Sequence, residues 1–419
     1  MTKAIILSGG IGSRLYPLTE DMPKPLVPIV NKAVISHVMK GLYDNGVRFA
    51  AIMLGHGADE IKRYISENGS EGLEIKYFKE DVPLGTAGAA ALARGEFDDD
   101  FVLSGGDTMF DLDIGGAINA HKKSGAVATM IVSHISDPCM FGSVTVEQNG
   151  AVTGFVEKPV WRDVRGDMIS SGVYILSPRI FELVPRGTFC DFAKDIFPRL
   201  VGCGLYAYCD DGYFCDVGTP FSYLRANMDA CGGKSVISPL ATVSKKADVR
   251  GSVIMDGAVV MDDAAVIDSV ICRKAVIERG AVAERAVVRA GERIEQNCTA
   301  TKNDNIDANI RIRAARLIRR ERMRASGEFS AEIAPFDRLK KCTVIGRALA
   351  PHGSARTIGE LIKRGCAADD GGVTLLYDGG SATVCCVGED EMEVTVRSDT
   401  SARAEKLFEF TIKGIKDLF

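Results

Sequence analysis

The stretch KAIILSGGIGSRLYPLTEDMPKP, Lys3 to Pro25, contains the pattern on which the fold prediction rests. It begins with a short apolar run typical of a buried strand and continues directly into a glycine-rich turn. Three further strand patterns follow, in FAAIMLG, LEIKYF and DFVLSGGD, and helical patterns lie between them. Such alternation predicts a mostly parallel sheet with ligands bound at the carboxyl ends of its strands. The glycine turn follows the first strand, where a ligand site is expected.

The glycine turn fits neither of two common phosphate-binding loops. A dinucleotide fingerprint would use Gly10 and Gly12, but Leu15 stands where its third glycine is required. A Walker loop needs Gly-Lys followed by serine or threonine, which this turn lacks. What remains is a flexible turn with two positive charges, Arg14 and Lys24, suited to a polyphosphate. The alternative is an ordinary tight turn with a solvated arginine and lysine.

Composition and charge describe an ordinary globular chain. Its 419 residues are enough for two or three domains, and 46% of them are hydrophobic. A formal charge of -5 gives no overall basic field for nucleic acid. The 12 cysteines are scattered, without the spacing of a zinc site, which favours a reducing cytoplasm over secretion. Because no apolar run is long enough for a signal sequence or a membrane span, we expect a cytoplasmic protein without membrane contact.

Further motifs follow in the order found in a known family. They are PLGTAGA (83–89), SGGD (104–107), FVEKP (155–159), SSGVYIL (170–176) and GYFCDVGTPFSYLRAN (212–227). Together with GGIGSRLYPLTEDMPKPLVPI, this series resembles the sugar-phosphate nucleotidyltransferases, and among them the mannose-1-phosphate guanylyltransferases most. The resemblance implies a Rossmann-like nucleotidyltransferase domain over residues 1–233.

The resemblance implies a reaction between two polyanions. A sugar 1-phosphate oxygen attacks the α-phosphorus of a nucleoside triphosphate in line, and pyrophosphate leaves, so the site needs positive charge rather than a protein nucleophile. GTP and mannose 1-phosphate are the expected substrates, since the form LGTAGA favours guanine or uracil over thymine by analogy. Two alternatives stay open. One is uridylyl or adenylyl transfer to glucose 1-phosphate, and the other is a non-catalytic regulatory subunit that binds a nucleotide sugar.

The resemblance also assigns catalytic and nucleotide-binding roles. Arg14 and Lys24 would hold the triphosphate, while Asp107 and Asp216 would bind Mg²⁺. An aspartate at a strand end is commonly a turn or helix cap, so only the pairing within the motif series marks these two. Nucleotide contacts are expected from two glycine-rich segments, at Leu7, Gly9, Gly10, Gly12, Ser13, Gly85, Thr86, Ala87 and Gly88.

The sugar 1-phosphate is expected to contact residues of three later motifs, namely Gly142, Glu157, Lys158, Ser171 and Gly172. In the family pattern, the lysine of EKP binds the phosphate and the glutamate accepts hydrogen bonds from sugar hydroxyls. On an extended segment Glu157 and Lys158 would point to opposite sides unless Pro159 introduces a kink. An exposed surface pair is the alternative.

A different periodicity begins after Gly233. From Ala241 onward, small residues recur in steps of 6, 6 and 5, each followed two residues later by an aliphatic residue or alanine. This hexapeptide pattern predicts a left-handed parallel β-helix of about three coils over residues 236–300. Related enzymes use such a helix for acyl transfer with a histidine base, but none of the 5 histidines lies in it. We therefore expect a structural role.

The two segments that follow the predicted β-helix, residues 301–326 and 327–419, contain no intact active-site motif. Residues 301–326 form a basic, arginine-rich segment without interleaved aromatics, which favours a linker helix over nucleic-acid binding. Residues 327–419 contain VTLLYDGGSATV, EVTVRSD and an expected closing helix, SARAEKLFEFTIKGIKDLF. With these segments they resemble the small α+β C-terminal domain of phosphomannomutases. The phosphate loop of that family is replaced here by CCVGEDE, Cys385 to Glu391, whose acids would repel phosphate. We expect a degenerate remnant, and a homo-oligomer formed through it or through the β-helix.

Overall fold

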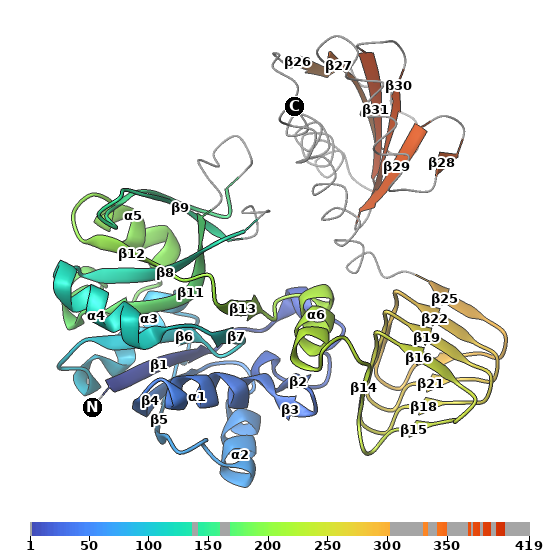
Figure 1. Cartoon of the computed structure of the whole chain (residues 1–419), viewed down its shortest axis with the longest axis horizontal. Coiled ribbons are helices and arrows are strands. Elements are labelled where there is room, and N and C mark those ends of the chain that lie inside the picture. The colour runs from blue at the N-terminus through green and yellow to red at the C-terminus, as the bar shows by residue number, and fades with distance from the viewer. Residues whose placement is uncertain are drawn as a thin grey trace. The chain divides into compact units, whose positions relative to one another are not determined.

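The structure is a computed structural model that describes the backbone of residues 2–135, 141–159 and 168–301 and of six strands between residues 330 and 398. The chain divides into two compact units, 1–301 and 302–419, each of which is described by itself. The first unit holds a nine-stranded sheet followed by the predicted β-helix (Figure 1).

The middle of the nine-stranded sheet is parallel. β1 (Thr2–Ser8) lies between β4 (Val47–Leu54) and β6 (Phe101–Gly105), and β5 (Glu74–Lys79) pairs with β4 at the edge. The helices between these strands are α1 (Val34–Asp44), α2 (Ala58–Asn68) and α3 (Gly85–Ala90). The predicted alternation of strands and helices is confirmed. The chain runs from β1 outward to β5 and returns as β6 on the other side of β1, so the strand order reverses between β1 and β6.

Beyond β6 the sheet becomes mixed. β11 (Met168–Leu176) runs antiparallel to β6 and also pairs with β8 and β9. The other strands of this half are β8 (Ala128–His134), β9 (Gly142–Val146), β10 (Val152–Glu157) and β12 (Leu205–Cys209). Of these, β12 is parallel to β8, and β10 is antiparallel to β9. This mixed half of the sheet carries the segments predicted to contact the sugar 1-phosphate.

Helices cover both faces of the sheet. One buried cluster contains residues of α1, α2 and α4 (Ile114–Ser124), and the other contains residues of α3 and α5 (Phe197–Leu200). Ile5 of β1 belongs to the second cluster, whereas Ala4 and Ile6 belong to the first, because successive side chains of a strand point to opposite faces. A continuous apolar run such as AIIL therefore suits a central strand covered on both sides. Among the described residues, none of the helices has the length and apolarity needed to cross a membrane.

A two-stranded ribbon lies beside the sheet. β7 (Thr108–Asp111) pairs antiparallel with β13 (Tyr213–Asp216). After it, α6 (Pro220–Ala230) begins with a capping box between Thr219 and Ser222. Shorter elements complete this part: the single helical turns Ser13–Leu15 and Lys24–Leu26, the hairpin β2 (Pro28–Ile29) and β3 (Lys32–Ala33), and the turns Ala91–Glu96, Pro178–Leu183 and Phe192–Ile196.

The β-helix follows α6 and has three parallel faces. One face holds β14 (Val236–Ile237), β17 (Val253–Ile254), β20 (Val270–Ile271) and β23 (Val287–Val288); the second holds β15 (Thr242–Val243), β18 (Val259–Val260), β21 (Val276–Ile277) and β24 (Arg293–Ile294); the third holds β16 (Asp248–Arg250), β19 (Ala265–Ile267), β22 (Val282–Glu284) and β25 (Thr299–Thr301). Each face has four strands, one more than the three coils expected, because the strands at both ends lie outside the strictest part of the repeat. Aliphatic residues 17 apart stack inside, for example Ile254, Ile271 and Val288.

Buried serines at one corner of the β-helix, which we call the serine ladder, form hydrogen bonds between successive coils. Ser252 Oγ accepts from the Ser269 N–H at 3.0 Å and donates to Val266 O at 3.2 Å. One coil further, Ser269 Oγ accepts from the Ala286 N–H at 3.0 Å. The small residue at this corner thus pairs backbone groups that would otherwise be buried without partners.

The second unit contains a six-stranded antiparallel sheet. Its strands are β26 (Ser330–Ile333), β27 (Cys342–Leu349), β28 (Ala368–Asp369), β29 (Gly372–Tyr377), β30 (Gly380–Cys386) and β31 (Glu391–Ser398). The spatial order is β26-β27-β31-β30-β29-β28. The predicted linker helix, the closing helix and the middle of CCVGEDE lie outside the described residues.

Candidate active site

The glycine turn after β1 is held in a conformation that requires glycine. Gly12 has φ +73°, and a Cβ there would lie 2.9 Å from Lys24 Cβ. Thr19 Oγ1 donates to Gly12 O at 3.0 Å, which closes the turn. Leu15, at the position of the missing third glycine, is fully buried and anchors the turn in the core. The turn therefore presents its backbone to a ligand by a different packing from that of a dinucleotide loop.

Lys24 reaches across this turn to two aspartates. Its Nζ forms an ion pair with Asp107 Oδ2 and lies 3.6 Å from Asp216 Oδ1. Asp107 follows β6 and Asp216 ends β13, and the Val217 N–H donates to Asp107 O at 3.0 Å, which holds the two segments side by side. The side chain of Lys24 is only 13% exposed. One ammonium is thus buried between two carboxylates.

The charges of this cluster perturb one another. Burial acts to lower the pKa of Lys24, but the attraction of Asp107 and Asp216 together outweighs it, so the pKa is raised. The pKa of Asp216 is raised by burial and by repulsion from Asp107, against the opposing attraction of Lys24, Arg14 and Lys158. The two carboxylates therefore demand a cation between them. Because Arg14 and Lys158 also act on Asp216, both lie within electrostatic reach of the pair.

The pair of carboxylates fits Mg²⁺. This ion prefers one or two carboxylates together with phosphate oxygens, and Asp107 and Asp216 converge on one positive group. Asp107 and Asp216 would hold the ion through their carboxylate oxygens, and the ion would supply charge neutralisation at the phosphates. Gly218 leaves these carboxylates room, because a Cβ at this residue would lie 2.9 Å from Asp216 Oδ2.

A pocket of about 220 Å³ opens beside the cluster, at the carboxyl ends of β1 and β6. Its lining residues are Leu7, Ser8, Gly10, Gly12, Ser13, Arg14, Lys24, Pro25, Asp107 and Gly218. The location is the point where the strand order reverses, which is where open α/β sheets bind ligands. Most of the residues predicted for the triphosphate and its chemistry therefore line one cavity. Gly9 is adjacent but turned toward Glu80, whose Oε1 would lie 2.6 Å from a Cβ at this residue.

The second predicted nucleotide segment is bonded to another turn. The N–H groups of Ala87 and Gly88 both donate to Cys190 O, at 2.9 and 3.0 Å. Thr86 Oγ1 donates to Asp191 Oδ2 at 2.9 Å. Gly85 has φ +72° and packs directly on Cys190. Since these backbone donors already have partners, any base contact here must come from other groups of the turn.

The predicted sugar-phosphate residues meet across β9 and β10. Gly142 pairs with Glu157, and a Cβ on Gly142 would lie 2.7 Å from Phe155 Cε2. Lys158 has φ +46°, a strained value for a non-glycine residue, and its Nζ lies 3.5 Å from Glu157 Oε1. A kink is thus present at Lys158 itself rather than at Pro159, and it brings the two charged groups to within 3.5 Å of each other.

Ser171 and Gly172 differ in their surroundings. Ser171 is buried and its Oγ donates to Ile131 O at 2.9 Å, so its hydroxyl serves the sheet. Gly172 has φ +83°, and within the part of the chain that the structure describes only Thr108 Oγ1, at 3.9 Å, lies within 4 Å of a Cβ placed there. The irregular register of β11 at this point brings Gly172 next to the ribbon that carries Asp216.

Ser8 is a further candidate site residue that was not predicted from the motifs. Its Oγ is buried and has no hydrogen-bond partner among the described residues, yet the residue lines the pocket. An unpaired buried hydroxyl is costly and suits a ligand oxygen. Its position immediately before the first glycine was the available signal.

The β-helix contacts the segment between Arg14 and Lys24. Arg273 Nη2 lies 2.9 Å from Asp21 Oδ2, and Arg289 Nη2 lies 2.5 Å from Glu20 Oε1. Arg289 also lies over the ring of Tyr16, 5.4 Å from its centroid. Two arginines from successive coils therefore hold the outer part of the segment that connects Arg14 to Lys24.

Comparison with known proteins supports the motif interpretation. Residues 3–232 match the family model described as nucleotidyl transferase, and residues 223–316 match one described as GlmU-like, C-terminal hexapeptide. Neither match reaches the C-terminal sheet, so its resemblance to phosphomannomutases stays a prediction.

Relatives of this chain are named for reactions with different substrates. A mannose-1-phosphate guanylyltransferase catalytic subunit beta of Dictyostelium discoideum is 36% identical over 228 residues, which cover 53% of this chain and 62% of that protein. A UTP–glucose-1-phosphate uridylyltransferase of Synechocystis sp. is 32% identical over 240 residues, covering 54% and 62%. The chain thus spans slightly less than two thirds of the length of these curated relatives.

A solved structure shares the fold. It is that of a putative glucose-1-phosphate thymidylyltransferase from Bacillus anthracis, which has a TM-score of 0.50 and 24% identity and covers 55% of this chain and 95% of that one. The predicted fold class, a Rossmann-like domain followed by a left-handed β-helix, is confirmed. Because the nucleotidyl transferase model matches more than half of its length, this chain belongs to the nucleotidyl transferase family.

Proposed function

We propose that the chain joins a nucleoside triphosphate to a sugar 1-phosphate, forming a nucleotide sugar and pyrophosphate. The observation that carries the proposal is Lys24, buried between Asp107 and Asp216 beside the glycine turn. This arrangement concentrates positive charge and metal-binding carboxylates around one pocket. Two polyanionic reactants need both.

Each group of the pocket has a distinct task. Backbone N–H groups of the glycine turn and the Ser8 hydroxyl bind triphosphate oxygens. Arg14 and Lys24 stabilise the negative charge that develops on the departing pyrophosphate. Mg²⁺, when bound by Asp107 and Asp216, supplies charge neutralisation at the phosphates. Lys158 holds the phosphate of the sugar 1-phosphate. Its charge acts to lower the pKa of Asp216, which supports a position of Lys158 beside the reacting groups.

Among the possible substrates, we propose GTP and mannose 1-phosphate. The relative from Dictyostelium discoideum, which is named as a mannose-1-phosphate guanylyltransferase catalytic subunit, supports this pair. The uridylyltransferase from Synechocystis sp. keeps UTP with glucose 1-phosphate as the alternative. Epimeric sugars differ in one hydroxyl orientation, so the choice depends on hydrogen bonds around Glu157 and Gly172.

The test is pyrophosphate release in Mg²⁺ from each nucleoside triphosphate paired with mannose 1-phosphate or glucose 1-phosphate. We expect turnover with GTP and mannose 1-phosphate. Turnover with another pair alone would contradict the substrate assignment and keep the reaction. Absence of turnover with every pair, with nucleotide-sugar binding retained, would refute the reaction and favour a regulatory subunit.

A second test addresses the cluster itself. Lys24→Gln should lower kcat by about 10²- to 10³-fold, because it removes a charge that stabilises the transition state. Lys40→Gln is the matched control, since Lys40 is an exposed lysine of α1 whose Nζ pairs with neighbouring Asp44. Equal activity of the two variants would contradict the role assigned to Lys24.

We also propose that the chain forms a homo-oligomer through the β-helix. Three large apolar side chains of the β-helix, Ile237, Leu240 and Met261, are exposed. Light scattering coupled to size exclusion tests this, and a monomer at all concentrations would refute it.

A further inference from the structure

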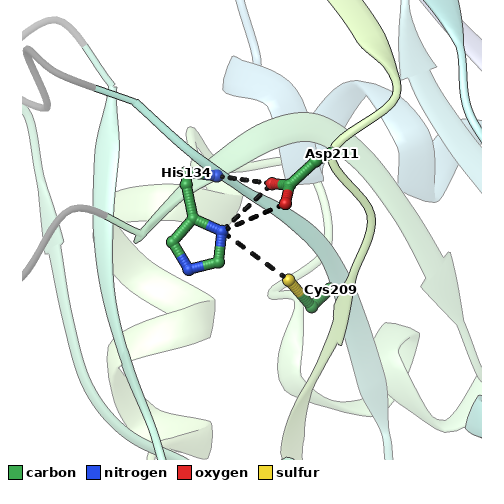
Figure 2. A group of neighbouring side chains, drawn as sticks. All are labelled: His134, Cys209 and Asp211. Atoms are coloured by element: carbon green, nitrogen blue, oxygen red, sulfur yellow. Dashed lines mark hydrogen bonds and ion pairs between the residues drawn. The ribbon is translucent and has the colours of Figure 1, made fainter.

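We propose that His134, Cys209 and Asp211 form a binding site for one borderline-soft divalent cation of the Zn²⁺ class. A potential ligand atom of each lies within 4.8 Å of the other two. Figure 2 shows the imidazole, the thiol and the carboxylate converging on one point. The cysteine spacing in the sequence indicates no zinc site, and the three residues belong to none of the predicted motifs.

Strand pairing creates this juxtaposition. β8 and β12 are parallel, with Val132 opposite Cys209, so both strands end at the same edge of the sheet. His134 is the last residue of β8, two residues beyond Val132, and Cys209 is the last of β12. Because residues two apart in a strand share a face, the imidazole and the thiol lie on one face as diagonal neighbours.

The turn after β12 adds the third group. Asp210 is held inward, since its N–H donates to Val132 O at 2.9 Å and its Oδ2 accepts from the Asp113 N–H. The next residue, Asp211, then lies over the end of β8, where its Oδ1 accepts from the His134 N–H at 3.0 Å. The backbone on both sides of the site is therefore fixed by hydrogen bonds.

The distances are close to those of a tetrahedral site. His134 Nδ1 lies 3.0 Å from Asp211 Oδ1 and 4.0 Å from Cys209 Sγ. In a tetrahedral Zn²⁺ site with bonds of about 2.0 to 2.3 Å, ligand atoms lie about 3.3 to 3.8 Å apart. The third separation, between Cys209 Sγ and the Asp211 carboxylate, is no more than 4.8 Å. The side chains of His134 and Asp211 are 43% and 64% exposed, which leaves the fourth position to water.

The donor set separates this site from the catalytic one. Thiolate and imidazole favour Zn²⁺ over Mg²⁺, whereas the two carboxylates of the active site favour Mg²⁺. The site is nevertheless on a path to the reaction centre, because β13 begins at Tyr213, two residues after Asp211, and ends at Asp216. A bound cation would tie the end of β8 to the start of this connection.

The test uses the full chain, freed of metal, with Zn²⁺ measured by calorimetry and Co²⁺ by absorbance. We expect the wild-type protein to bind Co²⁺ with a thiolate-to-cobalt absorption band and to keep it in millimolar Mg²⁺. Cys209→Ser should abolish that band. His134→Ala and Asp211→Asn should each weaken Zn²⁺ binding at least about tenfold, the scale of losing a contact at a metal site.

Cys203→Ser is the matched control, because Cys203 is also exposed and its thiol donates to Arg199 O, at 3.3 Å, outside the cluster. It should retain the band and bind Zn²⁺ within about twofold of wild type. All variants are first compared for thermal unfolding without metal, so that a loss of folding is recognised. A band that persists in Cys209→Ser, or Zn²⁺ affinities unchanged in all three cluster variants, would overturn the proposal. So would an absence of wild-type binding below millimolar Zn²⁺, which leaves only a hydrogen-bonded His134–Asp211 pair.

Discussion

Gly57 lies outside every predicted motif, and we expect Gly57→Ala to impair catalysis. This glycine precedes α2, has φ +69° and packs against Pro23, the residue before Lys24. A Cβ on Gly57 would lie 2.7 Å from Pro23 Cβ and closer still to Pro23 Cγ. Because ordinary carbon contacts are about 3.5 to 4.0 Å, the proline must move by about 1 Å. Lys24 moves with it.

Two free-energy effects follow from that displacement. A misplacement of about 1 Å in a group that positions the reaction lowers the rate by about 10²-fold, or about 2.7 kcal/mol. The left-handed backbone and the overpacking together should lower the free energy of unfolding by about 2 to 4 kcal/mol. The first effect is read as kcat/KM in the pyrophosphate-release assay, and the second by urea denaturation.

Gly46→Ala is the control for backbone strain alone. Gly46 has φ +84°, but no atom of the described residues lies within 4 Å of a Cβ placed there. We expect a loss of about 1 kcal/mol in the free energy of unfolding and kcat/KM within about twofold of wild type. If the two variants, compared at temperatures where both are folded, have equal kcat/KM, the reasoning that links Gly57 to Lys24 is refuted.

Three further predictions concern the β-helix. Arg289→Ala removes the ion pair with Glu20 and should raise KM for the triphosphate by less than about tenfold, because exposed ion pairs are weak. The increase in KM should be smaller at high salt, which screens the pair. An unchanged KM at low salt would contradict a role for Arg289 in holding the segment between Arg14 and Lys24. Ser269→Ala leaves the Ala286 N–H buried without its acceptor and should lower the free energy of unfolding by about 1 to 3 kcal/mol in urea denaturation; an unchanged midpoint would contradict the serine ladder. Burial raises the pKa of Cys272 to about 12, so its reactive thiolate is scarce in the folded protein at pH 8, and mass spectrometry should find it alkylated only after unfolding.

The order of strands, helices and coils could be predicted from the sequence because each depends on periodicity over a few residues. The apolar run of β1, the helical spacing in α1 and the steps of 6, 6 and 5 in the β-helix are local patterns of this kind. Two local features could not be predicted from sequence patterns, because they depend on tertiary contacts. The kink at Lys158 needs a left-handed residue that no propensity indicates, and the donors of Ala87 and Gly88 are taken by Cys190, far along the chain.

The site divides in the same way. The candidate site residues could be identified in the motifs, because phosphate chemistry requires arginine, lysine, aspartate and glycine at short spacings. Their convergence required strands to pair: β6 beside β1 places Asp107 near the glycine turn, and β13 beside β7 brings Asp216 to it. The cluster at the end of β8 shows this most clearly, since His134 meets groups 75 and 77 residues away only through the register of β8 and β12. A linear pattern specifies which side chains exist and how each segment folds; which of them share a cavity or a metal is set by sheet order and register, because these bring distant segments within bonding distance.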